Sequence, residues 1–224
     1  MDTTAFTRQG FVLVPKVLSP AECESLTSRL AGVSPDSAGT RSLLSQDWCQ
    51  ALAATLRRHP LLAPLLSAGY AAVQCTYFEK SAARNWLVPV HQDLSIPVAA
   101  RVEHASLGGW SEKEGVLYVQ PPAELLRQLV ALRLHIDACG AEDGALRVVP
   151  CSHLMGRMEE QAVAAARHAG TEVVCTVGPG GVMAMRPLLL HASSKSTENS
   201  RRRVLHFLFG PRALPFGLQW QLAI

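Results

Sequence analysis

The stretch after residue 70 constrains the fold most, because it is a series of short strand-like runs. These runs are rich in β-branched and other apolar residues and are separated by turn residues. They read AVQCTYFEK, NWLVPVHQDLSI, QLVALRLHID, ALRVVP, TEVVCTV, GGVMAMRP and RRVLHFLF. Many short strands of this kind are typical of antiparallel barrels and sandwiches. We therefore expect residues 71–224 to form a β core.

The first seventy residues show helical patterns instead. Ser19 and Pro20, followed by Glu22, predict a helix that starts with a capping box. A second helical stretch covers residues 46–58. We expect residues 1–70 to form a helical flank beside the β core.

Residues 98–122 form a polar, glycine-bearing insertion within the β region. Because a long connection beside a site often acts as a lid, we interpret this insertion as lid-like. A chain of 224 residues with 48% hydrophobic content is long enough for one sizeable core. The sequence thus predicts one domain over residues 1–224.

Charge and composition argue against several classes of partner. The formal charge of +3, from 21 basic and 18 acidic residues, is too balanced to indicate nucleic-acid binding. Apolar stretches are interrupted by proline, glycine or charge, and no basic leader with a long apolar core opens the chain. The six cysteines are far apart and include no C-x-x-C pair. We expect a cytoplasmic protein with buried, reduced cysteines, no membrane partner, and either a monomeric or a homodimeric state.

Residues 89–98, PVHQDLSIPV, carry a histidine and an aspartate two positions apart. On an extended backbone His91 and Asp93 project to the same side, with Gln92 opposite, which suits a metal ion. His135 and Asp137 repeat this spacing. Neither pair is specific alone, because a strand histidine is more often a hydrogen-bonded core residue than a ligand.

A third candidate ligand, His191, lies between two later strand-like runs. Two histidines and a carboxylate on one face of a metal leave three positions open, which suits non-haem Fe(II) and oxygen. The arginines that follow could anchor a dicarboxylic co-substrate through paired donors. Alternation puts Arg202 on one face and Arg201 and Arg203 on the other, without deciding which face is inside. The alternative is that all three are solvated charges at a strand edge.

The segments FTRQGFVLVPKVLSPAECESL, HQDLSI, GALRVVPCSH and LLLHASSKSTENSRRRVLHF, in this order, resemble the phytanoyl-CoA dioxygenase family of Fe(II)- and 2-oxoglutarate-dependent oxygenases. The resemblance covers nearly the whole chain. It implies a mainly β fold with flanking α, namely a double-stranded β-helix or cupin-like jelly roll with N-terminal helices. It also implies an enzyme that uses O2 to hydroxylate an unactivated C–H bond of a small metabolite, releasing succinate and CO2.

The resemblance also implies the site residues. By position, His91, Asp93 and His191 become the catalytic iron ligands, and Arg202 becomes the partner of the distal carboxylate of 2-oxoglutarate. Lys80 stands where some members place a lysine that contacts the co-substrate. For Lys80 the alternative is an ordinary surface ion pair with its neighbouring glutamate.

Other polar and aromatic side chains near the expected pocket are candidate substrate contacts. They are Gln74, Asn85, Trp86, Gln92, Trp110 and His135. Each has an alternative interpretation as a core, strand-edge or loop residue. The arginines that could neutralise an anionic group are Arg101, Arg133, Arg147 and Arg186.

Two other classes of protein use similar side chains. A zinc-type or cupin-like hydrolase or isomerase would need no 2-oxoglutarate, so loss of Arg202 should leave its activity unchanged. A non-catalytic jelly-roll binding or sensor protein would keep the fold without turnover. The metal-ligand set and the arginine argue against this last interpretation.

Overall fold

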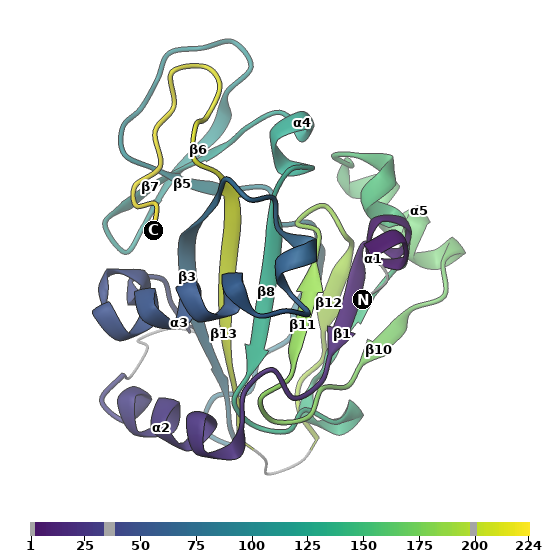
Figure 1. Ribbon diagram of the computed structural model, residues 1–224. Helices are drawn as coiled ribbons and strands as arrows, with labels where there is room; N and C mark the ends of the chain where they lie inside the picture. The colour runs from purple at the N-terminus through teal and green to yellow at the C-terminus, as the bar shows by residue number, and fades with distance from the viewer. Residues whose placement is uncertain (1–2, 34–38, 198–200) are drawn as a thin grey trace.

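The computed structural model describes residues 3–33, 39–197 and 201–224, which form three β-sheets with helices around them (Figure 1). The largest sheet has the order β1 (Phe11–Val14), β11 (Val182–Met185), β8 (Val130–His135), β13 (Arg202–Pro211), β3 (Tyr70–Lys80) and β2 (Gly39–Thr40). The second has the order β10 (Val173–Cys175), β9 (Leu146–Val148), β12 (His191–Ser193) and β4 (Val88–His91). The third has the order β5 (Ile96–Val98), β7 (Val116–Gln120) and β6 (Gly108–Lys113).

The largest and second sheets pack against each other as a jelly roll. Met183 of β11 and Val148 of β9 belong to one buried hydrophobic cluster, so the two sheets share a core. All strand pairs within the sheets are antiparallel. In the largest sheet, β8 lies between β11 and β13, so neighbouring strands are distant in sequence, as in jelly rolls. The predicted fold class is confirmed.

Helices surround the sheets, and Figure 1 shows α3 across the largest sheet and α2 beside the lower end of β3. The α-helices are α1 (Thr3–Gln9), α2 (Pro20–Leu30), α3 (Asp47–Arg58), α4 (Ala123–Leu126) and α5 (Glu160–Ala169). Short 3-10 turns cover Leu43–Ser45, Ala63–Leu65, Ala141–Asp143 and Ser152–Met155. α5 has no counterpart among the predicted helices, and none of its residues is buried. Its Val163 and Ala166 are partly buried against a small hydrophobic cluster.

The capping box predicted for α2 is present. The Ser19 hydroxyl accepts the Glu22 N–H at 3.3 Å, and the Glu22 carboxylate accepts the Ser19 N–H at 2.7 Å. These two bonds satisfy backbone donors that a helix start leaves unpaired. The start of α2 could therefore be located from sequence alone.

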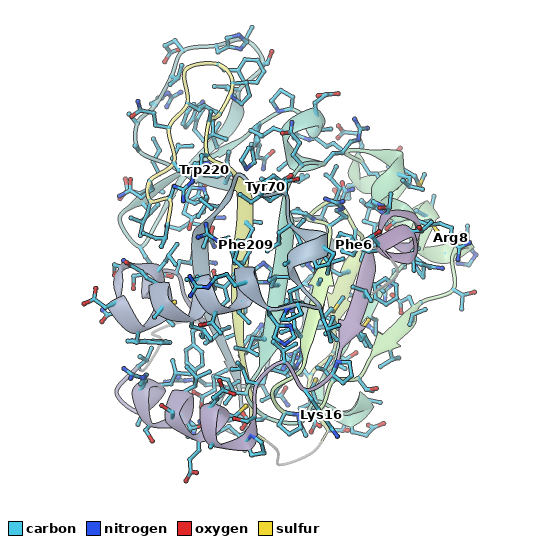
Figure 2. The ribbon with its side chains drawn as sticks, in the orientation of Figure 1. Phe6, Arg8, Lys16, Tyr70, Phe209 and Trp220 are labelled. Carbon is cyan, nitrogen blue, oxygen red and sulfur yellow. The ribbon has the colours of Figure 1, made fainter. Side chains whose placement is uncertain are left out.

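The insertion at residues 98–122 contains β6 and β7, which pair with each other, and β7 also pairs with β5. Val98 also forms an isolated bridge with Trp220, whose indole Nε1–H donates to Pro211 O at 2.7 Å. Figure 2 shows Trp220 and Tyr70 near the end of the largest sheet on this side. The C-terminal segment thus supports the third sheet, and the lid-like role of the insertion stays a prediction.

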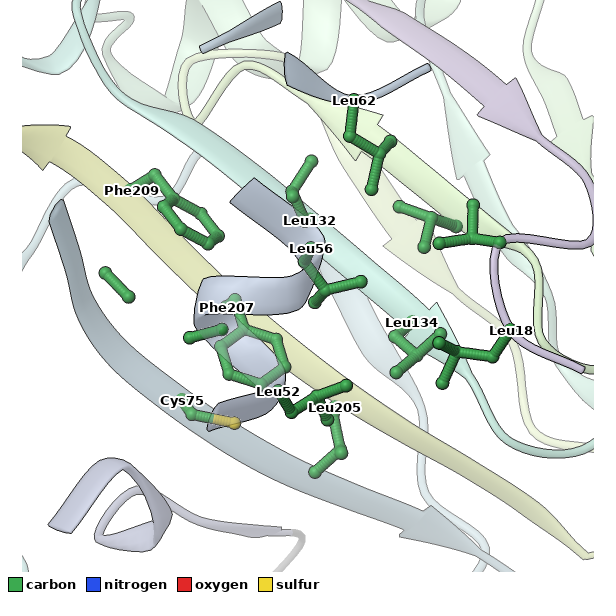
Figure 3. Packing of buried hydrophobic residues seen from close by; sticks show 14 of the residues in the cluster. Leu18, Leu52, Leu56, Leu62, Cys75, Leu132, Leu134, Leu205, Phe207 and Phe209 are labelled. Atoms are coloured by element: carbon green, nitrogen blue, oxygen red, sulfur yellow. The ribbon is translucent and has the colours of Figure 1, made fainter. Parts of the chain in front are cut away.

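The main hydrophobic core lies between the largest sheet and the N-terminal helices. Figure 3 shows Leu52 and Leu56 of α3 packed near Leu205 and Phe207 of β13. Phe207 has no exposed surface. Because side chains alternate along a strand, this packing turns the other face of β13, which carries Arg202, toward the second sheet.

Two expectations about composition can be compared with the structure. Cys151 is exposed, so the prediction that the cysteines are buried is wrong for this residue, whereas the other five are buried, and all six are free thiols. Cys151 directly precedes the 3-10 turn at Ser152–Met155 and has φ +66°. Among the described helices, none has the length and hydrophobicity needed to cross a bilayer.

Candidate metal centre

His91 and His191 are brought together by the pairing of β4 with β12. They are directly opposite each other in the antiparallel register, and their ring centroids are 4.2 Å apart. β4 ends at His91, so Asp93 lies just beyond the strand rather than within it. There the Asp93 N–H donates to Pro187 O at 2.9 Å. The three side chains predicted as ligands therefore converge.

The ligand atoms of this cluster lie close enough to share one metal ion. His91 Nε2 is 3.6 Å from Asp93 Oδ1, and His191 Nε2 is 3.7 Å from Asp93 Oδ2. Within the described ranges, this is the one group of three or more His, Cys, Asp or Glu side chains whose ligand atoms all lie within 4.8 Å. Two histidines and one carboxylate are the ligand set of non-haem iron oxygenases.

Backbone carbonyls fix the protonation of both histidine rings. His91 Nδ1 lies 2.8 Å from Pro89 O, and His191 Nδ1 lies 2.9 Å from Leu189 O. A carbonyl only accepts, so each Nδ1 carries the hydrogen and the neutral ring keeps its lone pair on Nε2. In metal-binding histidines, the ring nitrogen that does not bind the metal usually donates a hydrogen bond of this kind, which orients the ring. The residues present therefore fit a divalent metal ion.

Electrostatics favour the metal-binding states of Asp93 and His191. Burial opposes ionisation of Asp93, but the charge of His191 and the hydrogen bond from His91 outweigh it and hold the pKa of this carboxyl well below its usual range. Burial lowers the pKa of His191 to about 4. For the more exposed His91, burial is outweighed by the hydrogen bond and charge of Asp93, which raise its pKa. At neutral pH, Asp93 is thus ionised and His191 neutral, as metal binding requires.

Gln92, between the two candidate ligands His91 and Asp93, is 7% exposed. Its Nε2 donates to Gly156 O and Leu188 O, both at 2.7 Å, and its amide oxygen accepts the Met158 N–H at 2.9 Å. Both amide hydrogens are therefore used within the protein. Gln92 holds the HQD segment against two other loops, which makes it a positioning residue.

The cluster opens into a pocket of about 410 Å³ between the largest and second sheets. The third sheet also contributes to its wall. Lining residues include Gln74, Thr76, Phe78, Trp86, Lys113, Tyr118, Arg133, Ser193, Arg202 and His206. A volume of this size suits a small molecule.

Arg202 lies in the pocket wall and is 4% exposed. One of its Nη atoms donates to Gly144 O, and the Ser193 hydroxyl donates to the same carbonyl at 2.8 Å. The buried Nε of Arg202 has no hydrogen-bond partner among the described residues. Gly144 has φ +68°, and a Cβ there would lie 2.5 Å from Ser194 O. Only glycine therefore fits this turn without strain.

The two neighbouring arginines face away from the pocket. Arg203 makes a paired ion contact with Asp137, with Nη2 2.6 Å from Oδ1 and Nε 2.8 Å from Oδ2. Arg201 pairs with Glu79 at 3.0 Å on the surface. Asp137, the carboxylate of the second H-x-D pair, is thus occupied by Arg203 and is not part of the metal cluster.

Lys80 is opposite Arg202 in the register of β3 and β13 and is 1% exposed. Its Nζ donates to the Ser193 hydroxyl at 2.7 Å and to Ser194 O, and it does not line the pocket. Burial, followed by the charge of Arg202, lowers the pKa of Lys80 to about 7. Lys80 therefore supports Ser193, and the alternative of a surface ion pair is wrong.

Three of the six candidate substrate contacts line the pocket, namely Gln74, Trp86 and Gln92. Asn85 does not line it, because its amide exchanges two hydrogen bonds, at 2.7 and 2.8 Å, with the backbone of Ser196. The guanidinium of Arg101 lies 5.2 Å from the centroid of the Trp110 ring, and Trp110 does not line the pocket. Asn85 thus holds the backbone at Ser196, whereas Trp110 belongs to strand β6 and contacts Arg101.

His135 is also outside the pocket wall, although it is 3% exposed and on the inner face of β8. Neither ring nitrogen has a hydrogen-bond partner among the described residues. Burial, followed by the charges of Arg133 and Arg202, lowers its pKa to about 3. His135 is thus a neutral core residue.

The sequence did not single out several lining residues as site candidates. Thr76, Tyr118, Ser193 and His206 all border the pocket. His206 shares the Arg202 face of β13, so alternation would have identified it once the inner face was known. Tyr118 lies in the third sheet, and no local pattern indicates its position.

Comparisons with known proteins agree with this geometry. A model of the family described as Phytanoyl-CoA dioxygenase (PhyH) matches residues 6–204, whereas no curated protein matches the sequence. Among solved structures, AviO1 from Streptomyces viridochromogenes Tue57 is 22% identical with a TM-score of 0.63, covering 95% of this chain and 94% of AviO1. HygX from Streptomyces hygroscopicus, with nickel and 2-oxoglutarate bound, is 18% identical with a TM-score of 0.63, covering 93% and 85%. The non-heme alpha ketoglutarate dependent epimerase SnoN from nogalamycin biosynthesis is 16% identical with a TM-score of 0.66, covering 96% and 84%.

A jelly roll that encloses two histidines, a carboxylate and a buried arginine in one pocket defines a class, the non-haem iron oxygenases that use 2-oxoglutarate. Because the family match extends over most of its length, the chain belongs to the phytanoyl-CoA dioxygenase family. It is a 2-oxoglutarate-dependent dioxygenase that uses iron and acts on a small molecule.

Proposed function

We propose that this dioxygenase hydroxylates an unactivated C–H bond of a small metabolite, with release of succinate and CO2. One observation carries the proposal: His91, Asp93 and His191 converge in a pocket that also contains Arg202. A metal with these three ligands keeps positions open for the co-substrate and oxygen.

Each residue has a separate role in this proposal. His91, Asp93 and His191 hold the iron, and Arg202 binds the distal carboxylate of 2-oxoglutarate. When bound, iron and 2-oxoglutarate together supply the activated oxygen for attack on a C–H bond. The guanidinium of Arg202 is already held by Gly144 O, so it offers its free donors in a fixed orientation. This fixed geometry reduces the entropy cost of positioning the co-substrate.

The pocket walls support a small substrate with an apolar portion. Phe78, Trp86 and Tyr118 provide aromatic surface, and Gln74 adds a polar group. The Gln74 Nε2 donates to the Thr76 hydroxyl at 2.7 Å, and this hydrogen bond does not involve the amide oxygen of Gln74. An apolar wall lets a substrate C–H bond face the metal while water is excluded.

Anaerobic titration with Fe(II) and then 2-oxoglutarate tests the proposal through the visible charge-transfer band of the iron–2-oxoglutarate complex. We expect the band in the wild type, its loss in His91→Ala, and a large increase in the 2-oxoglutarate needed for Arg202→Ala. Arg201→Ala is the matched control, because Arg201 is exposed and pairs with Glu79. A wild type that binds metal without the band would favour a zinc-type hydrolase or a binding protein.

Product analysis tests the finer statement about hydroxylation. Candidate metabolites are screened by succinate release, and the products are examined by mass spectrometry. Hydroxylation predicts one added oxygen atom that derives from O2. A product without added oxygen would contradict hydroxylation while leaving the dioxygenase class intact, and SnoN, a structural neighbour, is described as an epimerase.

A further inference from the structure

A second buried arginine, Arg133 of β8, lines the same pocket as Arg202 and is 7% exposed. Its Nη1 donates to His206 Nδ1 at 2.8 Å, because a guanidinium has donors only. The guanidinium also lies 5.5 Å from the centroid of the Phe78 ring. Its buried Nε has no hydrogen-bond partner, and within the described ranges no acidic side chain forms an ion pair with it.

Arg133 and Arg202 therefore leave positive charge unbalanced inside the pocket. Asp93 is the one acidic side chain among the described lining residues, and a metal ion would take up its charge. Burying an unpaired guanidinium is costly. Burial, followed by the charge of Arg202, lowers the pKa of Arg133 to about 10. A dicarboxylate brings two anionic groups, one more than Arg202 can bind.

The two arginines are at different places along the pocket. Arg133 is opposite His206 in the register of β8 and β13, whereas Arg202 begins β13. With about 3.3 Å per residue, the Cα atoms of Arg202 and His206 are roughly 13 Å apart. Arg133 and the candidate ligands His91 and His191 line the same pocket.

We propose that Arg133 binds the carboxylate at the 2-oxo acid end of 2-oxoglutarate, so that the co-substrate is held between two arginines. This inference rests on the proposed function, since it assumes that 2-oxoglutarate occupies the pocket with its 2-oxo acid end toward the metal. His206 is the positioning residue for Arg133, because its unprotonated Nδ1 accepts the guanidinium hydrogen bond. Arg202 then serves the distal carboxylate alone.

The test uses two ligands that differ only in the distal carboxylate, namely 2-oxoglutarate and 2-oxopentanoate. Their dissociation constants are measured by isothermal titration calorimetry on the Fe(II) protein without oxygen. Arg133→Gln should weaken both ligands about ten- to hundredfold, because a charge-assisted bond to their common end is lost. Arg202→Gln should weaken 2-oxoglutarate similarly and leave 2-oxopentanoate within about twofold.

Controls separate this inference from the proposed function. Arg147→Gln should leave both constants unchanged, because Arg147 pairs with Glu172 away from the pocket wall. Arg133→Lys should restore part of the affinity, and it replaces Arg133→Gln if that variant fails to fold. If Arg133→Gln keeps wild-type affinity for both ligands, or loses affinity for 2-oxoglutarate alone, the inference is overturned. If the wild type itself does not bind 2-oxoglutarate, the proposed function fails instead.

Discussion

Replacing Lys80 by methionine should change how the stability of the protein depends on pH. Lys80 is 1% exposed, and its pKa is lowered from 10.5 to about 7 by burial and then by Arg202. In the unfolded chain this lysine keeps its proton up to its ordinary pKa. Between pH 7 and that value the unfolded state therefore binds more protons than the folded state. The contribution of Lys80 to the free energy of unfolding therefore rises with pH in this window.

The size of the effect follows from the two pKa values. Each pH unit in the window adds up to about 1.4 kcal/mol, so the rise from pH 7 to pH 9 is roughly 2 kcal/mol after allowing for partial protonation near pH 7. Below pH 7 both states are protonated and the contribution is constant. Methionine has a similar length and no charge, so Lys80→Met should lack this rise.

The assay is urea denaturation of both proteins at pH 6, 7, 8 and 9, without metal or 2-oxoglutarate. The stability of the wild type minus that of Lys80→Met should be flat from pH 6 to just below 7 and should then increase. Lys195→Met, at an exposed lysine, is the matched control and should follow the wild type. Parallel curves for wild type and Lys80→Met would refute the reasoning, because they would mean that Lys80 keeps an ordinary pKa in the folded state.

Three further substitutions test the structure. Gly144→Ala should cost about 1–3 kcal/mol of stability, because φ is +68° and the new Cβ would lie 2.5 Å from Ser194 O; thermal unfolding at wild-type temperature would contradict this. Gln92→Leu should cost about 1–3 kcal/mol by leaving buried groups such as the Met158 N–H unpaired, and should weaken Fe(II) binding in a metal titration; unchanged Fe(II) affinity would argue against a positioning role. Phe207→Ala should cost about 3–5 kcal/mol in urea denaturation, because the ring is fully buried, and a loss below about 1 kcal/mol would contradict that burial.

The fold was predictable where the local sequence pattern favours the same element that the tertiary structure contains. Ser19 and Glu22 cap α2 because two complementary side chains lie three residues apart, and that pattern needs no distant partner. Long alternating runs such as β3 and β13 formed where expected. β12 and the strands of the 98–122 insertion were not predicted, because short segments become strands only when a partner strand pairs with them.

The convergence of the three candidate ligands was predictable, and the surroundings of the site were less so. His91 and Asp93 carry a local spacing, and the family resemblance added His191. Asn85 and Trp110 were proposed for substrate but lie outside the pocket wall. Asn85 is in a connection and Trp110 in β6, and the sequence alone does not show which way either side chain points. The position of Arg133 in the wall depends on the orientation of β8 within the sheet.

The sequence by itself determined the mainly β class, the H-x-D spacing and the two alternating faces of the last strand. These properties depend on residues that are neighbours along the chain, so the backbone geometry of a single strand is enough to state them. Only the tertiary structure decided that Phe207 faces the helices and that Arg202 consequently faces the pocket. It also decided that His191 meets His91 across β12 and β4, because a strand register is set by contacts between segments that are far apart in sequence.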